Sequence, residues 1–334
     1  MATIGANQLT LQEILRRKDP NGVAAKIAEL LHQYNPILDH IPWKPSNQDT
    51  SHVMTVRTAL PTVGWRRFNQ GVTPTKSRTM QVTEDMGILE SWSVIEKDLA
   101  EIGGDVRGAR SSEAAAHMEG MAQEFASTLL YGNHGTTPEE FTGIMARYPN
   151  ASSGDTVVNT LDANGAGADN ASILLVGWGE ETVFGLYPRN SQAGIIHEDF
   201  GVQSVVDPND STKVMRAYQE RFQWKTGLGV KDWRWIVRLG SIDVSVLEAD
   251  PTGTTTNLIQ WMVKMIHKVP NAAAKSVNFK FYVPRVVGEM LDVQAMNKTN
   301  LYLTVGDEEG MRKTKLRGIE ICTLDAMTEA EALV

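Results

Sequence analysis

Leu129 to Ile144 reads LLYGNHGTTPEEFTGI, and this stretch ends a long predicted helix. Upstream of it, apolar side chains recur at steps of four, three, four and four, which is the spacing of one face of an α-helix. Gly132, Asn133 and Gly135 follow, and these residue types tolerate the left-handed backbone found at helix C-termini. The pattern indicates a rigid rod with a sharply defined end and a second turn at Gly143. The residues of the apolar face are Ala114, Met118, Met121, Phe125 and Leu129.

The first 50 residues are predicted to form an arm. Thr10 and Glu13 have the spacing of a capping box at the start of one helix, and Asp19-Pro20 opens a second helix. A polar, proline-bearing run follows at 42–49. The apolar faces of these helices have no adjacent local partner. We therefore expect the arm to lie across another surface, with folding back on its own body as the alternative.

Residues 51–85 are predicted to form an extended two-stranded excursion. Strand-like segments at 53–58 and 77–83 are separated by turns and contribute little core of their own. Isolated hairpins are marginally stable in water, so this one is expected to gain order from a neighbour. A strand at 86–95 and a short helix at 97–102 complete the approach to the long helix.

Residues 150–172 are rich in Asn, Ser, Gly, Ala and Asp, which is the clearest shift of composition and favours a domain boundary. After it, the segments 172–178 and 182–187 are predicted to pair as a hairpin across a turn at Gly179. Residues 232–239 are predicted to be one strand, with apolar side chains on one face and arginines on the other.

The C-terminal third mixes helices and strands. Amphipathic spacing predicts a helix over 258–266 and another over 285–297, with a strand at 277–283 between them. Strands are then predicted at 301–305 and 313–324, separated by a turn. The order of elements indicates an α+β chain.

Composition excludes several classes of protein. Lys plus Arg total 32 against 40 acidic residues, a net charge of −8, and no basic run is long enough to be a nucleic-acid tail. An acidic surface repels DNA, although only over a Debye length of about 8 Å at physiological salt. No apolar run approaches the roughly 20 residues of a membrane helix, and the start lacks a secretion signal. We expect a protein made and kept in a cytoplasm.

Metal and disulfide sites are not predicted. Cys322 is the single cysteine, so neither an internal disulfide nor a cysteine metal site is expected, and its strand-like surroundings favour a buried structural thiol. The seven histidines form no HExxH or HxH pattern, so a zinc site would have to be assembled from distant positions. His117 is predicted to be a structural histidine beside the apolar stripe.

No catalytic or cofactor-binding residue is predicted, and the chain is not expected to be an enzyme. His197, Glu198 and Asp199 form the only dense acid/base cluster, but they follow a loop-like segment, and consecutive residues do not converge on one point. The run 227–229 lacks the third glycine and the strand–helix frame of a dinucleotide site. No phosphate loop or nucleophile elbow occurs. Asp243 with Asp250, or Glu180 with Glu181, could pair as carboxylates, but nothing favours them.

Several segments, in order, resemble a known family. They are the extended loop with its run at 71–77, the spine helix with its YGN-G exit, the segment 176–188, and the closing run 316–321 with Asp325-Ala326. Together they cover most of the chain and resemble tailed-bacteriophage major capsid proteins of the Hong Kong 97 type. The resemblance implies that copies form hexamers and pentamers of an icosahedral shell around double-stranded DNA.

The resemblance also implies a division of the chain and a set of partners. The expected regions are an N-terminal arm (1–50), an extended loop (51–85), a peripheral domain with the spine helix (86–165), an axial domain (166–300) and closing strands of the peripheral domain (301–334). The expected partners are other copies of the chain, a separate scaffolding protein, a portal protein, a cement protein and packaged DNA bound without sequence-specific contact, with no membrane. The virion is the expected location, after assembly in the host bacterial cytoplasm.

Two alternative functions remain open beside that of a phage capsid protein. Encapsulin-like shells share the fold, and an unrecognised hydrolase could use His197, Glu198 and Asp199.

Some members of the family crosslink a loop lysine to an asparagine of a neighbour. Lys76 lies in the matching loop, but no asparagine follows Asn300, where the partner is expected. We therefore predict no autocatalytic crosslinking.

Overall fold

A computed structural model describes residues 33–102, 104–151, 157–207, 210–297, 303–308 and 311–334. The chain divides into two compact units, each treated by itself below. Among the described residues, the first unit contains Gln33, 88–127 and 192–225, and the second contains 34–87, 128–191 and 226–334. The two helices predicted before residue 33 lie outside the described residues. No helix in the described part of the chain is both long and apolar enough to cross a membrane.

The first unit packs one long helix on antiparallel strands. Its elements are α3 (Lys97–Glu101) and parts of α4 (Val106–Tyr131), β3 (Arg78–Glu96), β7 (Ile196–Asp207) and β8 (Asp210–Val230). β7 pairs with β8 from Ile196↔Gln223 to Asp207↔Asp210, with irregularities in register. On α4, Phe125 stacks on Trp224 with ring centroids 4.3 Å apart. The predicted strand at 86–95 and short helix at 97–102 are confirmed.

The long helix begins and runs as its sequence predicts, but its apolar face is only partly buried. Asp105 Oδ1 accepts a hydrogen bond from the Gly108 N–H at 2.8 Å, which satisfies a donor in the first turn. Met121 and Phe125 are buried, whereas Met118 is 44% exposed. The first half of the helix instead meets polar side chains. His117 Nδ1 lies 2.6 Å from Ser91 Oγ, so this histidine has the predicted structural role.

The second unit is built on a mixed sheet. The strand order is β11 (Leu303–Glu308), β12 (Met311–Leu316), β13 (Ile319–Thr323), β10 (Asn278–Val283), β5 (Asn170–Trp178), β6 (Val183–Tyr187), β8, β3 and β2 (Ser51–Ala59). β9 (Ile236–Asp243) pairs with β5 and with β4 (Thr160–Asp162), and β1 (Trp43–Pro45) pairs with β6. Short helical pieces are α2 (Ile37–His40), α5 (Ile144–Arg147), η1 (Val157–Asn159) and η2 (Trp233–Trp235).

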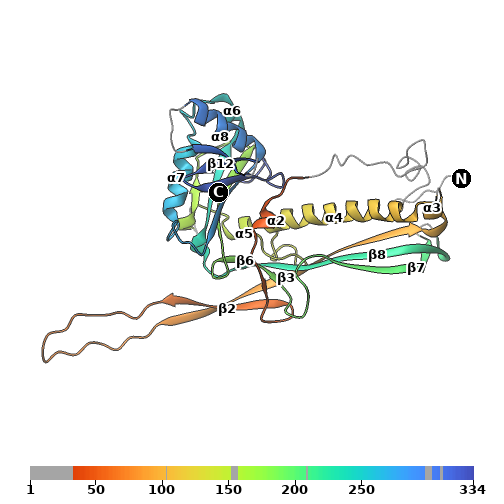
Figure 1. Cartoon of the computed structure of the whole chain (residues 1–334). Helices are drawn as coiled ribbons and strands as arrows, with labels where there is room; N and C mark the ends of the chain where they lie inside the picture. The colour runs from red at the N-terminus through yellow and green to blue at the C-terminus, as the bar shows by residue number, and fades with distance from the viewer. Residues whose placement is uncertain (1–32, 103, 152–156, 208–209, 298–302, 309–310) are drawn as a thin grey trace. The chain divides into compact units, whose positions relative to one another are not determined.

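The core of the second unit lies where helices cover one face of this sheet. α6 (Val244–Ala249), α7 (Leu258–Lys268) and α8 (Arg285–Asn297) gather beside the strands in Figure 1. They pack against side chains of β5, β9 and β10 in one apolar cluster. All of β5 is buried, as expected for a strand covered on both faces. The two predicted C-terminal helices and the strand between them are confirmed.

The predicted hairpin of 172–187 is wrong. β5 takes β9 and β10 as antiparallel neighbours, and it meets β6 only at Trp178↔Val183, in a parallel sense. β6 finds its antiparallel partner in β8. The local turn signal at Gly179 is real, since the Thr182 N–H donates to its carbonyl. However, a strand buried on both faces is paired by distant segments on both edges, and this long-range pairing overrides the local pattern.

Two other predicted strands have different bounds in the structure. Residues 233–235 form η2, because the Asp232 carboxylate accepts the Arg234 N–H at 3.1 Å and turns the chain before β9 begins. The predicted strand 313–324 is two strands, β12 and β13. Arg317 and Gly318 separate them with φ of 51° and 82°, the left-handed conformation of a tight turn. Cys322 is buried on β13, as predicted.

Candidate assembly site and its supports

The projecting hairpin consists of β2, the first part of β3 and the connecting residues 60–77. Its strands pair from Ser51↔Asp85 to Ala59↔Arg78, with a bulge after Arg57. Figure 1 shows the hairpin in orange, and its connecting residues run on well past the paired strands. The predicted extended two-stranded excursion is therefore confirmed.

The tip of the hairpin exposes large apolar side chains. Trp65 and Phe68 are essentially fully exposed, and Val63 is 90% exposed. Large apolar side chains exposed together on one segment are typical of interaction surfaces, because water is a poor environment for them. The exposed apolar residues of the tip are Leu60, Val63, Trp65, Phe68 and Val72.

The base of the hairpin is fixed by a buried ion pair. Arg147 donates from both terminal nitrogens to the Glu84 carboxylate, at 2.7 and 2.6 Å, and also to the Thr142 carbonyl at 3.0 Å. Glu84 is only 5% exposed. Such bidentate pairs fix orientation as well as adding energy. His52 lies opposite Glu84 on β2, and burial, followed by the charge of Lys44, lowers the pKa of His52. The hairpin thus has a rigid root and an unsupported tip.

The turn after α4 is tight for a reason the sequence did not reveal. None of Gly132, Asn133 and Gly135 has a positive φ, so the predicted left-handed backbone at the helix exit is wrong. Instead, the Gly143 N–H donates to the Gly132 carbonyl at 2.8 Å. A Cβ at Gly132 would lie 2.5 Å from the Thr128 carbonyl oxygen, and one at Gly143 would lie 2.6 Å from the same oxygen. Glycine is needed here because backbones approach closely.

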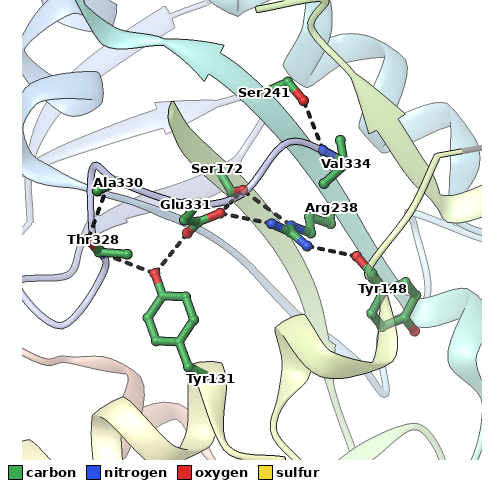
Figure 2. Close-up of polar contacts among 9 residues, drawn as sticks. All are labelled: Tyr131, Tyr148, Ser172, Arg238, Ser241, Thr328, Ala330, Glu331 and Val334. Atoms are coloured by element: carbon green, nitrogen blue, oxygen red, sulfur yellow. Dashed lines mark hydrogen bonds and ion pairs between the residues drawn. The ribbon is translucent and has the colours of Figure 1, made fainter. Parts of the chain in front are cut away.

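A buried polar network holds the C-terminal segment (328–334) against the rest of the second unit. Glu331 lies between Arg238 and Tyr131 in Figure 2. Its carboxylate accepts from Arg238 Nη2 at 2.9 Å and from the Tyr131 hydroxyl at 2.7 Å, and it also bonds Ser172. Arg238 donates in addition to the Tyr148 carbonyl at 2.8 Å. Burial, followed by the Glu331 charge, raises the pKa of Tyr131.

The network also holds the backbone that follows. The Val334 N–H donates to Ser241 Oγ at 3.1 Å, and the Thr328 N–H donates to the Tyr131 hydroxyl at 3.0 Å (Figure 2). The Glu331 N–H donates to the Asn170 carbonyl at 2.9 Å. These contacts join β5, β9, the end of α4 and the C-terminal segment. Sequence reasoning missed the network, because its members are separated by up to 200 residues.

The acid/base cluster His197, Glu198 and Asp199 lies on strand β7, not in a loop as predicted. Neighbouring residues of a strand face opposite ways, so His197 and Asp199 share one face while Glu198 pairs with Arg221 at 2.9 Å. His197 Nε2 lies 2.9 Å from Glu220 Oε2. The shared face forms a small network with α4.

Arg110 on α4 completes this network. Its guanidinium lies 2.6 Å from both Asp199 and Glu220. The hydrogen bond from Arg110 is the largest cause that lowers the pKa of Asp199. Burial opposes the charged form of Arg110, but the hydrogen bonds that Arg110 donates to Asp199 and Glu220 raise its pKa. The contacts are those of ion pairs that join α4 to β7 and β8.

The other carboxylates considered in the sequence have local structural contacts. Asp243 accepts from the Val246 N–H and caps α6. Asp250 accepts from Thr252 Oγ1 and the Thr255 N–H, both at 2.6 Å. Glu181 pairs with Lys231.

Comparison with known proteins assigns the family. The family model described as major capsid protein GP7 matches residues 19–334. The chain is similar to a chain of the near-atomic-resolution structure of bacteriophage epsilon15, with a TM-score of 0.80 and 31% identity over 100% of this chain and 99% of that one. No curated protein sequence matches.

More distant solved structures are also similar. One is the capsid of bacteriophage JBD30, with a TM-score of 0.49 and 11% identity over 91% of this chain and 96% of that one. Another is the holo-SrpI encapsulin complex from Synechococcus elongatus, with a TM-score of 0.47 and 10% identity over 70% of this chain and 96% of that one.

The expected resemblance and fold are confirmed by a family match over nearly the whole chain and by the epsilon15 structure. The same matches favour a viral coat over an encapsulin-like shell. This chain belongs to the GP7 family of bacteriophage major capsid proteins.

Proposed function

We propose that copies of this chain assemble as hexamers and pentamers into an icosahedral shell that encloses double-stranded DNA. The observation that supports this is the projecting hairpin, whose apolar tip has no other described element of its own unit against it. Burying one large apolar side chain contributes about 1.5–3 kcal/mol. A neighbouring copy that covers Trp65, Phe68 and Val63 would therefore gain several such contributions.

Each of the five regions expected from the sequence has its own role in the proposed shell. The arm (1–50) and the extended loop (51–85) contact neighbouring copies, and the described end of the arm also lies on its own unit, where β1 pairs with β6. The peripheral domain (86–165 with 301–334) and the axial domain (166–300) form the wall. The rigid root of the hairpin at Glu84 and Arg147 supports this role, because a fixed base directs the tip to one place on a neighbour. Permanent assemblies commonly bury roughly 2,000–5,000 Å² per interface.

The remaining partners are proposed from the role of a coat protein. DNA is enclosed without sequence-specific contact, which the net charge of −8 and the absence of a long basic run support. A separate scaffolding protein, a portal protein and a cement protein act on the shell during assembly in the host bacterial cytoplasm. We propose no catalytic role for the chain, because His197, Asp199 and Glu220 are engaged in ion pairs and a ring contact typical of a structural cluster.

The hairpin tip supplies the test of assembly. The double variant Trp65→Ser with Phe68→Ser removes the largest exposed apolar surface of the tip and leaves its root intact. We expect folded subunits that form few or no closed shells, measured by sedimentation velocity and electron microscopy. Circular dichroism and thermal unfolding of the unassembled chain should match those of the wild type.

Val246→Ser is the matched control, since Val246 is an exposed apolar residue (41%) on α6. This variant is expected to assemble normally. Closed shells of the double variant at wild-type yield would contradict the proposed role of the tip.

A further inference from the structure

Three potential metal ligands from distant parts of the sequence meet in the second unit. The donor atoms of His40, Glu320 and Cys322 all lie within 4.8 Å of one another. His40 ends α2, whereas Glu320 and Cys322 lie two positions apart on β13 and so share one face of the sheet. None of these residues takes part in the hairpin, the C-terminal network or the ion pairs of β7.

The strand pairing explains why the three ligands meet. β10 runs parallel to β13, with Lys280 opposite Glu320 and Tyr282 opposite Cys322. Tyr282 is fully buried, and its hydroxyl lies 2.9 Å from His40 Nδ1. The hydroxyl also accepts a hydrogen bond from Trp178 Nε1 at 2.8 Å. Tyr282 therefore holds the His40 ring above the strand that carries the thiol.

We propose that His40, Glu320 and Cys322 bind one Zn²⁺ ion, with water completing the shell. Thiolate and imidazole ligands select a borderline-soft ion such as Zn²⁺ over Mg²⁺ or Ca²⁺. Donor atoms around tetrahedral zinc lie about 3.3–3.8 Å apart, given metal–ligand distances of about 2.0–2.3 Å. Small side-chain adjustments bring these three ligands to that spacing.

The surroundings have the features of a supported site. A histidine that binds metal through one ring nitrogen usually donates a hydrogen bond through the other, and the Tyr282 hydroxyl can accept it beside the one from Trp178. Cys322 is 7% exposed, so a cation beside it favours the thiolate that burial alone disfavours. Lys280 pairs with Glu320 Oε2 and competes with the ion, so thiolate and imidazole dominate the affinity.

The site also has an entry path. His40 lines an open hollow of about 940 Å³, together with Trp178, Glu180 and Asn278. An ion can reach the imidazole from this hollow. Binding would join α2, which lies within the N-terminal arm (1–50), to β13 near the C-terminal segment.

Cobalt provides a sharp test, because Cys322 is the single cysteine of the chain. Cobalt bound to a thiolate gives a charge-transfer absorption, and here that absorption reports on one residue. Purified full-length chain, freed of metal with a chelator, is titrated with Co²⁺ and then with Zn²⁺. We expect the absorption to saturate at one Co²⁺ per chain and to disappear as Zn²⁺ displaces it, with a higher melting temperature in Zn²⁺.

Variants assign the ligands. Cys322→Ser should abolish the absorption. His40→Gln should weaken Co²⁺ binding at least tenfold, because even the loss of an outer-shell partner of a ligand typically costs about 10–100-fold in metal affinity. His267→Gln, at an exposed position on α7, is the matched control and should bind like the wild type. Absence of the absorption in the wild type would overturn the proposal, as would unchanged affinity in His40→Gln. The wild-type titration shows whether Cys322 binds the metal even if a variant fails to fold.

Discussion

Arg238 and Glu331 show how single residues join distant parts of the second unit. Both side chains are almost fully buried, at 7% and 4% exposure. A buried ion pair is not itself a large source of stability, because the removal of both charges from water offsets their attraction. The loss of one partner is different, since the remaining charge stays buried without its partner. The pair therefore fixes the path of the C-terminal segment more than it adds to stability.

Glu331→Gln tests this pair. We expect the free energy of unfolding of the unassembled chain to fall by about 3–5 kcal/mol, because Arg238 is left as a buried charge without its counter-ion. Urea denaturation followed by fluorescence measures the change. Lys97→Ala is the control, since the exposed Lys97–Glu101 pair is expected to contribute at most about 0.5 kcal/mol. Equal losses in the two variants would contradict the role given to burial.

Asp250 gives a pH-dependent prediction. The hydroxyl of Thr252, followed by the Thr255 N–H, stabilises its carboxylate and lowers the pKa to about 2. The unfolded chain has an Asp pKa near 3.9 and binds the proton first as the pH falls. The stability that Asp250 contributes is therefore present above about pH 4 and is lost as the pH falls through about 2.

Asp250→Asn should thus be less stable than the wild type at pH 7, and the difference should shrink towards zero near pH 2. Guanidinium denaturation across this pH range measures it. Glu248→Gln, at an exposed position on α6, controls for the loss of one negative charge. A difference that is constant from pH 7 to pH 2 would exclude the hydrogen-bonded carboxylate as its cause.

At the scale of elements, α4 and the projecting hairpin are positioned by their ends. α4 starts at the Asp105 cap and stops where Gly132 and Gly143 allow the backbone of 128–132 and that of 141–143 to approach each other. The hairpin is fixed at the Glu84–Arg147 pair and left without support at its tip. A hairpin with a fixed base and an exposed apolar tip suits the proposed role, in which a neighbouring copy covers the tip.

A pair of glycine substitutions separates crowding from helix propensity. Gly132→Ala should destabilise the unassembled chain by several kcal/mol, because its Cβ would lie 2.5 Å from the Thr128 carbonyl oxygen and 2.7 Å from that of Phe141. Gly120→Ala, inside α4 with open space around its Cβ, should stabilise the chain by up to about 1 kcal/mol. Thermal unfolding of both variants checks the opposite signs, and a stabilising Gly132→Ala would refute the crowding argument.

At the scale of the whole molecule, membership of the GP7 family makes the chain a subunit of a phage capsid shell. In the proposed shell, its arm and projecting hairpin contact other copies. One consequence concerns covalent bonds between subunits. Lys76 is exposed in the hairpin tip, but the closing segment after Asn300 contains no asparagine to receive it.

Denaturing gels of mature particles are therefore expected to show a single band at the 36.8 kDa of one chain, without a ladder of joined chains. Shell stability should depend on non-covalent contacts alone. A ladder that persists after boiling in detergent, and that disappears in Lys76→Arg, would show that the asparagine is supplied from elsewhere in the chain.

Much of the fold could be predicted from local pattern. The spine helix, the extended hairpin, α7, α8 and buried Cys322 all follow from the spacing of apolar residues and from turn-forming residues near their ends. These signals are local, because side-chain periodicity and capping act within a few residues of the chain. The family resemblance could be recognised for the same reason, since its motifs are short runs in a fixed order.

The tertiary structure alone decided which segments meet. β5 pairs with β9 and β10 instead of its neighbour β6, and Glu331 reaches Arg238 across 93 positions. His40 approaches Cys322 in the same way. Sequence by itself determined the elements and the family, because those depend on local periodicity and short motifs. Strand pairing, buried charge networks and the proposed zinc ligands depend on long-range packing. Many arrangements satisfy the local pattern, and the arrangement that buries the most apolar surface is the stable one.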